Sequence, residues 1–168
     1  MRPSSRPRSD QRGAVIVTVA LFMLFLLGFM GIALDFGRLF IVRTELQTAM
    51  DACALAAAQE LDGQADSIAR AQSAGVTAGN ANRVNLQSAD WAGQPQLTPA
   101  SIVFRATDYT VTTVSPSARY AQCQHTQASI QLWLLQALGA FSGDAALFPG
   151  TGSVGASAVA TRAGSQTT

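Results

Sequence analysis

The first third of the chain is dominated by one uninterrupted apolar run. Residues 14–34 are twenty-one positions with a single polar side chain, Thr18, and the charged residues Arg12 and Asp35 flank them. At about 1.5 Å per residue, a helix of this length matches the ~30 Å hydrocarbon core of a bilayer, and it satisfies its own backbone hydrogen bonds where water is absent. The pattern therefore predicts a transmembrane helix over residues 14–34.

After this run, apolar residues continue on one helical face only. They recur at spacings of three and four and comprise Leu39, Val42, Leu46, Met50, Cys53 and Ala57. Arginine, acidic and glutamine side chains occupy the opposite face, so residues 35–61 are predicted to extend the first helix as an amphipathic rod. This apolar stripe requires a partner, which is either the rest of this chain or a similar helix in another subunit.

Residues 62–163 show shorter, mixed patterns, which predict one small α+β domain. A short helix is expected over 65–78 and an apolar helix over 130–141, with strands over 101–106, 109–114, 118–122 and 154–161. The second of these helices is too short to span a bilayer and is expected in the core or on the membrane surface. The strands are expected to form an antiparallel sheet, residues 80–100 a loop around Trp91, and residues 164–168 a frayed tail.

The charges around the apolar run predict the orientation of the chain in the membrane. Residues 1–13 carry Arg2, Arg6, Arg8 and Arg12 against a single Asp10. Basic flanks stay in the cytoplasm, so this segment is expected inside and everything after the apolar run outside. For a Gram-negative source, we expect a single-pass protein of the bacterial inner membrane with a periplasmic C-terminal domain.

Composition limits the class of function. With 168 residues, the chain beyond the anchor holds one small domain. Charged residues make up 12% of the sequence, the formal net charge is +1, and no lysine is present. Because no basic cluster occurs beyond the N-terminal flank, no nucleic-acid partner is expected.

The two cysteines, Cys53 and Cys123, would both lie outside the cytoplasm under this topology, where disulfides persist. A bridge between them would close a loop of about 70 residues, for which the chain-entropy model predicts a stabilisation of roughly 4 kcal/mol. Alternatively they are two separate thiols, with Cys53 serving as a small apolar residue in an alanine-rich helix. The sequence leaves both alternatives open.

Four residues at the outer end of the apolar run are candidates for contacts between membrane helices. Ala33 and Gly37 place two small side chains on one helical face and allow a neighbouring helix to approach closely. Asp35 is expected to reach interfacial water or to pair with Arg38, which lies one turn later.

Catalytic and ligand-binding motifs are scarce. The only histidine, His125, has no nucleophile motif as a partner and is expected on an exposed loop, and together with Cys123 it lacks the further ligands of a closed zinc site. Residues 150–155 fit the G-x-G-x-x-G fingerprint, but Pro149 precedes them and a β-like run follows, so a turn-rich connection is expected there. We expect no enzymatic activity, metal, cofactor or small-molecule substrate.

Three stretches of the N-terminal part resemble a known protein family. They are Arg12-Gly13-Ala14-Val15, the end of the apolar span in residues 31–38, and residues 43–58, which follow the pattern R-x-x-L-Q-x-A-x-D-A-x-A-L-A-A-A. Together they resemble the N-terminal module of TadE/TadG-like proteins of Flp (Tad) pilus assembly. Met50 and Cys53 stand where alanines are usual in that module, and residues 154–160 are similar to the end of many family members.

The resemblance implies a structural or assembly role for a pilus at the inner membrane, with other Tad pilus-assembly subunits as partners. Larger TadG-like chains add a von Willebrand A-type domain with an Asp-x-Ser-x-Ser metal loop, and this sequence contains no such loop. The alternative function is that of a membrane-tethered binding module, with Trp91, Trp133 and Tyr109 lining a site.

Processing at either end of the apolar run would change this assignment. A signal peptide has an apolar region of about 7–15 residues and an A-x-A-like cleavage site, whereas this run is longer and ends in Ala33-Leu34-Asp35. Cleavage after Gly13 by a prepilin peptidase would make the protein a minor pilin, but type IV pilins usually carry Glu where Thr18 stands. We therefore expect the mature protein to retain its basic N-terminal segment.

Overall fold

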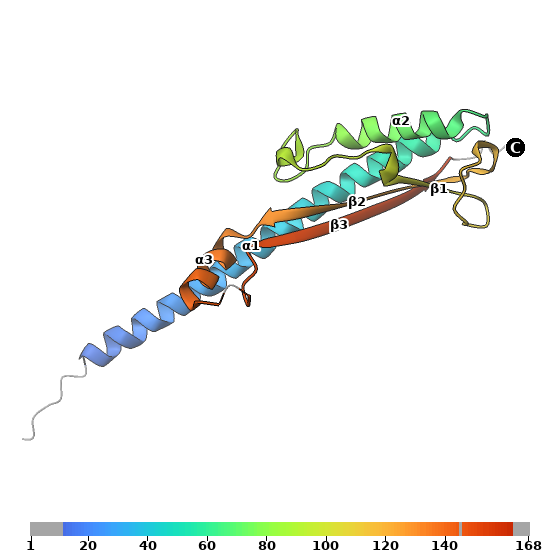
Figure 1. Ribbon diagram of the computed structural model, residues 1–168. Helices are drawn as coiled ribbons and strands as arrows, with labels where there is room; N and C mark the ends of the chain where they lie inside the picture. The colour runs from blue at the N-terminus through green and yellow to red at the C-terminus, as the bar shows by residue number, and fades with distance from the viewer. Residues whose placement is uncertain (1–11, 145, 163–168) are drawn as a thin grey trace, which may run out of the picture.

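The computed structural model describes residues 12–144 and 146–162. Residues 1–11 of the expected basic segment and the expected tail 164–168 lie outside the described residues. The helices are α1 (Arg12–Gln59), α2 (Ser67–Asn80) and α3 (Trp133–Ser142), and the strands are β1 (Ile102–Arg105), β2 (Tyr120–Gln131) and β3 (Thr151–Thr161). A long apolar helix, shorter helices and a three-stranded antiparallel sheet confirm the predicted α+β class (Figure 1).

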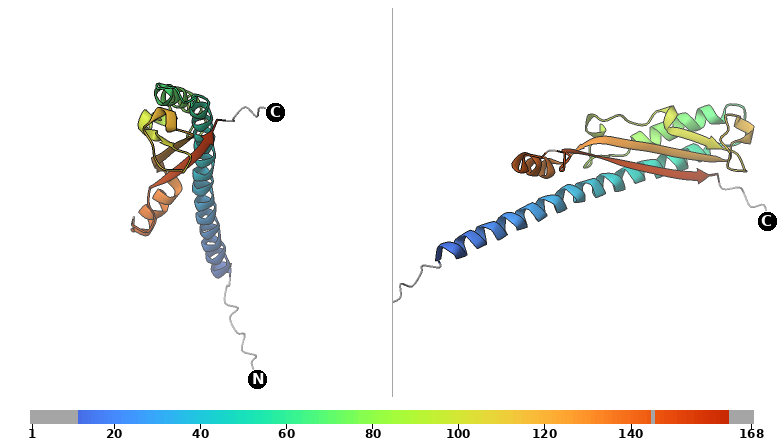
Figure 2. Two further views of the ribbon diagram at one scale, coloured as in Figure 1. Left: turned by 90° about the vertical axis from the view of Figure 1, so that its right-hand side faces the viewer. Right: turned by 60° about the horizontal axis from the view of Figure 1, so that its bottom comes forward.

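α1 is one continuous helix of 48 residues that contains both the apolar run and its amphipathic extension. No proline interrupts it. The Thr18 hydroxyl donates to the Ala14 carbonyl at 2.9 Å, so the helix itself satisfies the one polar side chain of the apolar run. The N-terminal part of α1 projects beyond the other elements, and its C-terminal part lies along the sheet and α2 (Figures 1 and 2).

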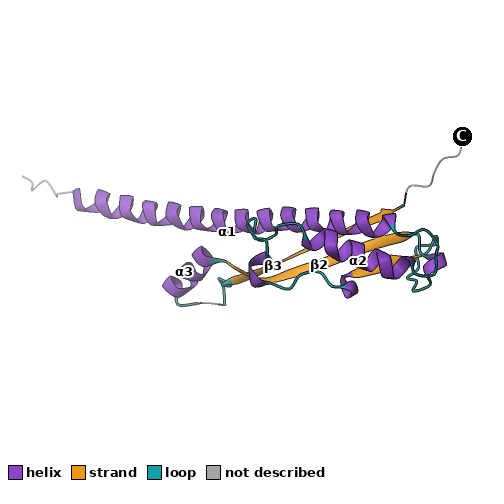
Figure 3. Cartoon of the chain, turned by 90° about the horizontal axis from the view of Figure 1, so that it is seen from above, coloured by secondary structure: helices purple, strands orange, loops and turns teal. Residues whose placement is uncertain are grey.

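The sheet has the strand order β1-β2-β3, and its two long strands lie along α1 (Figure 3). Both strand pairs are antiparallel, with Cys123 of β2 opposite Ile102 of β1 on one side and opposite Ala158 of β3 on the other. The hydrophobic core lies between α1, α2 and one face of this sheet, and it includes Leu46, Trp91 and Phe104. Burial of this apolar face is the main stabilising contribution to the fold.

α2 packs against α1 through small residues. A Cβ added at Gly79 would overlap Leu97 and lie 3.1 Å from the Cys53 Cβ, and one added at Gly75 would lie 2.8 Å from the Ile102 Cδ1 and 3.1 Å from the Ala57 Cβ. These distances leave no room for a larger side chain between the two helices. The close approach explains why α1 is rich in alanine on the face that α2 covers.

The predicted strand over 109–114 is wrong, and a loop occupies these residues. The Asp108 carboxylate accepts hydrogen bonds from the Thr110 backbone N–H at 3.2 Å and from the Thr110 hydroxyl at 2.7 Å, and Tyr109 has a φ of 66°. An aspartate that bonds two residues along the chain favours a turn over a strand ladder. A single bridge pairs Val111 with Arg105.

The C-terminal strands are longer than the sequence pattern indicates. The strand expected over 118–122 is β2, which begins at Tyr120 and continues to Gln131. Its pairing with β3 shifts register between Gln127 and Ile130. The expected turn-rich connection over 150–155 is also wrong, because β3 begins at Thr151 and pairs Gly152 and Gly155 with β2. Glycine in a strand weakens the alternating pattern by which strands are identified from sequence.

Candidate membrane anchor and assembly surface

The apolar run of α1 is largely uncovered by the rest of the described chain. Residues 13–30 are exposed, apart from the half-buried Gly28. Continuous apolar surface of this extent is favourable in lipid and unfavourable in water. Within the described residues, α1 is the one helix long and apolar enough to cross a bilayer, which suggests a single-pass membrane protein.

At the C-terminal end of the apolar run, two charged residues bind the backbone of a distant segment. Asp35 is 5% exposed, and its Oδ2 accepts a hydrogen bond from the backbone N–H of Leu135 at 2.7 Å. Leu135 lies in the first turn of α3, where N–H groups lack partners within the helix, so the carboxylate caps α3. Arg38 donates from Nη1 to the Gln131 carbonyl at 3.3 Å.

This arrangement differs from the expected one, in which Asp35 is solvated or paired with Arg38. In the described part of the chain, no ion pair joins the two side chains. Burial beneath α3 removes Asp35 from water, and the N-terminus of that helix supplies the positive partial charge that Arg38 was expected to provide.

Ala33 and Gly37 are both exposed, and a Cβ added at Gly37 would meet nothing within 4 Å. Phe36 and Phe40 are exposed on the same side of the helix, with 58% and 72% of their surface accessible. We call these four residues the open face of α1. An aromatic and small-residue surface at the end of a membrane span is suited to contact another helix.

The apolar stripe of α1 lies beneath this chain's own sheet and second helix. Val42, Leu46, Met50, Cys53 and Ala57 are fully buried, and the partly buried Leu39 packs against the same core. Of the two partners that the sequence leaves open, the structure places the rest of this chain on the stripe. The stripe is therefore not available to another subunit in this fold.

Cys53 and Cys123 form a disulfide that joins α1 to the central strand β2. Their Cα atoms are 6.2 Å apart, and both side chains are fully buried. Of the two alternatives for these cysteines, the structure has the bridge. It links the amphipathic extension to the sheet across a sequence separation of 70 residues.

The helix that carries these features coincides with a family match. Residues 13–60 match the family model described as putative Flp pilus-assembly TadE/G-like. This N-terminal segment is TadE/G-like. The match confirms the resemblance of the sequence, and it ends one residue after α1. No curated protein and no solved structure matches the chain.

An ion-pair cluster that the sequence analysis missed lies at the end of the TadE/G-like segment. Arg70 of α2 bonds Glu60 at 3.1 Å, and it also bonds Asp62 and Asp66 around the turn from α1 to α2. The hydrogen bond from Arg70 lowers the pKa of Asp66, and the hydrogen bonds to Asp66 and Glu60 raise the pKa of Arg70. Asp66 and Arg70 are four residues apart, a spacing from which an ion pair on one helix can be predicted. The contact of Arg70 with Glu60 could not be predicted in this way, because it depends on the turn that brings α2 back against α1.

The aromatic residues considered for a binding module lie in separate environments outside the TadE/G-like segment. Trp91 is fully buried and donates from Nε1 to the Asn82 carbonyl at 2.9 Å. Trp133 is 68% exposed on α3, and Tyr109 packs against Tyr120 with ring centroids 5.5 Å apart. These residues do not line a common cavity, so the structure gives no support to that alternative.

His125 lies on strand β2 rather than on the expected exposed loop. Its ring is half-buried and meets the Trp91 ring edge-on, with centroids 5.5 Å apart. Burial lowers the pKa of His125, which favours the neutral imidazole at neutral pH. Within residues 12–144 and 146–162, no group of three or more His, Cys, Asp or Glu side chains is placed to hold a metal ion.

Proposed function

We propose that this protein is a structural or assembly subunit of Flp (Tad) pilus assembly, anchored in the bacterial inner membrane by residues 14–34. The observation that carries the proposal is the coincidence of the TadE/G-like match with α1. The exposed apolar part of that helix supports membrane anchoring. The buried bridge between Cys53 and Cys123 supports an oxidising compartment, the periplasm, for the rest of the chain.

The proposed orientation has the N-terminus in the cytoplasm and the C-terminus in the periplasm, because the arginines precede the apolar run. A reporter enzyme that is active only outside the cytoplasm is expected to be active when fused after Thr168. A reporter that is active only inside is expected to be silent at the same site. The reverse pattern would show that the orientation is wrong.

Contacts with other Tad subunits are proposed to use the open face of α1 rather than the buried stripe. The open face continues the exposed surface of the apolar run across its C-terminal end, and it stays exposed although Phe36 and Phe40 border the start of β3. Neighbouring membrane helices can therefore extend their contact with α1 past the bilayer surface. Asp35 and Arg38 contribute indirectly in this proposal, since they hold α3 in place.

Phe40→Asp is expected to lower the number of assembled pili while leaving the amount of protein in the membrane unchanged. Phe40 is 72% exposed, so the substitution costs little folding free energy but places a charge in the proposed contact. Pili on cells that carry the variant as their only copy would be counted by electron microscopy. Phe40→Leu is expected to keep normal numbers, as is Val111→Asp, which changes a loop residue that is 62% exposed. A normal number of pili with Phe40→Asp would show that the open face does not contact other subunits during assembly.

A second candidate function is that of a minor pilin, favoured by the Arg12-Gly13-Ala14 junction in front of an apolar helix. We propose instead that the basic segment is retained, because its arginines hold the N-terminus inside. The intact mass of the protein from its native membrane distinguishes the two. A species that begins at Ala14 would support the minor pilin.

A further inference from the structure

We propose that α3 and the described residues of the turn that follows it, 133–144 and 146–148, form a second membrane-inserted element, which lies in the outer leaflet beside α1 and is covered by lipid acyl chains. The proposal rests on the membrane anchoring of α1 proposed above. It assigns a lipid contact to a segment about a hundred residues from the apolar run.

α3 lies beside the end of the apolar run rather than beside the amphipathic extension. The chain leaves β2, runs as α3 toward the N-terminal part of α1, and returns to begin β3 (Figure 1). A Cβ added at Gly31 would lie 3.2 Å from the Leu134 Cβ, and the hydrogen bond from Leu135 to Asp35 fixes the same crossing. α3 is therefore held where α1 is still apolar.

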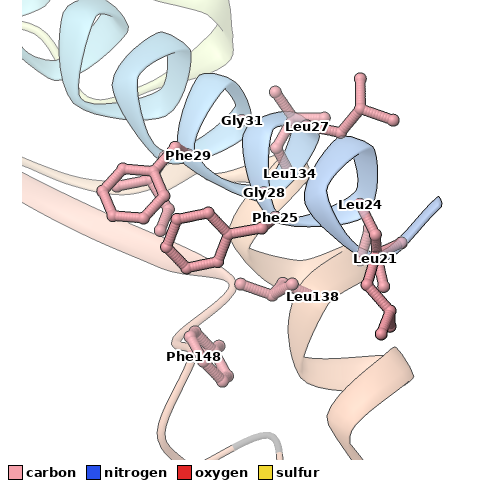
Figure 4. Close-up of a pocket in the computed structure, with 12 residues that line it drawn as sticks. Leu21, Leu24, Phe25, Leu27, Gly28, Phe29, Gly31, Leu134, Leu138 and Phe148 are labelled. Atoms are coloured by element: carbon pink, nitrogen blue, oxygen red, sulfur yellow. The ribbon is translucent and has the colours of Figure 1, made fainter. Parts of the chain in front are cut away.

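An apolar groove of about 610 Å³ separates α1 from α3, which diverges from it (Figures 2 and 4). On the α1 side it is lined by Leu21, Phe25 and other residues of the apolar run, and on the other side by Leu138 and Phe148. Phe25 and Leu21 lie ten and fourteen residues before Asp35, which corresponds to about 15 Å and about 21 Å along a helix, so the groove extends from the end of the apolar run to about the middle of a ~30 Å hydrocarbon core. Because the groove is continuous with the lipid-facing surface of the span, the acyl chains that surround the span also fill the groove.

The chemistry of the segment fits lipid. Trp133 and Leu147 are 68% and 71% exposed, a large cost if they faced water. Residues 120–143 contain no Asp, Glu, Lys or Arg, α3 satisfies its interior backbone groups, and tryptophan favours the membrane interface. Asp144 is the one charged residue between residues 120 and 161. It limits how deeply α3 and the following turn can enter the bilayer, because a carboxylate at the bilayer centre is costly. The element therefore stays within the outer leaflet.

Fluorescence quenching by brominated lipids tests the proposal with the full chain in phosphatidylcholine vesicles. The chain has two tryptophans, Trp133 and the fully buried Trp91, so the difference between wild type and Trp133→Phe isolates the emission of Trp133. We expect brominated acyl chains to remove most of that emission and aqueous iodide to remove little. The residual Trp91 emission is expected to resist both quenchers.

Phe22→Trp, made in the Trp133→Phe background, reports on α1 alone, because Phe22 is exposed on the apolar run. Quenching of this variant by lipid, without quenching of Trp133, would overturn the insertion of α3 while leaving the anchor in place. Protection of Trp133 from both quenchers would show that protein, such as a second copy, covers α3 instead. If Phe22→Trp is not quenched either, the anchoring of α1 fails together with the insertion of α3.

Discussion

Leu46→Asp is expected to unfold the part of the protein that follows the apolar run and to lower the steady-state level of the full-length chain in cells. Leu46 is fully buried in the core where α1 meets the sheet. The substitution removes its packing and leaves an unpaired carboxylate without water, a combination that costs about 4 kcal/mol or more. A domain of this size has a total unfolding free energy of about 5–15 kcal/mol, so little stability would remain.

Protease resistance of the purified protein in mild detergent, together with its steady-state level in cells, measures this effect. Leu55→Asp is the matched control, since Leu55 lies on the same helix and 58% of its surface is exposed. We expect the control to keep nearly wild-type resistance. Equal resistance of the two variants would show that the stripe does not pack as the structure has it.

Replacing both cysteines, as in Cys53→Ala with Cys123→Ala, is expected to lower the unfolding free energy by about 4 kcal/mol. The bridge closes a sequence separation of 70 residues, so its loss gives the unfolded chain a large number of additional conformations. Both sites are buried, and at position 53 alanine fits among the small residues between α1 and α2. Thermal unfolding in detergent, compared with the wild type under oxidising conditions, measures the difference.

The reduced wild-type protein provides the control for packing. It is expected to lose stability to a similar degree, because it retains both cysteine side chains and lacks only the bond. A pair of thiols that both react with a maleimide in denatured protein, isolated without reductant, would show that the bridge does not form.

The long N-terminal helix could be predicted because its signals are local. An uninterrupted apolar run and a spacing of three and four indicate a helix without any knowledge of distant residues. These local signals do not indicate what covers the apolar face of the helix. Periodicity distinguishes the apolar face of α1 at Leu46, but whether this chain or another subunit covers that face depends on contacts across the whole sequence.

The remaining elements were harder to predict because their buried positions are small or polar. β2 buries Ala121 and Cys123, and also Gln127, which is 1% exposed and donates from Nε2 to the Trp91 carbonyl at 3.3 Å. A glutamine in the core is indistinguishable in sequence from one in water. The position of α3 was equally inaccessible, since Asp35 and Leu135 meet across a separation of 100 residues.

Because the sheet is fastened to α1, the proposed anchoring of this helix in a membrane also couples the position of the sheet to the tilt of the helix. Roughly 25 residues of α1 extend from Asp35 to Gln59, about 37 Å at the rise of an α-helix, with the disulfide and the buried stripe distributed along them. Sheet and helix must therefore move as one body. A change of about 10° in the tilt of the span, well within the range that bilayers allow, sweeps the far end through about 6 Å. With α1 in the bilayer as proposed, bilayer thickness and the packing of neighbouring helices would therefore shift the turn between α1 and α2, which Arg70 joins by its ion pairs.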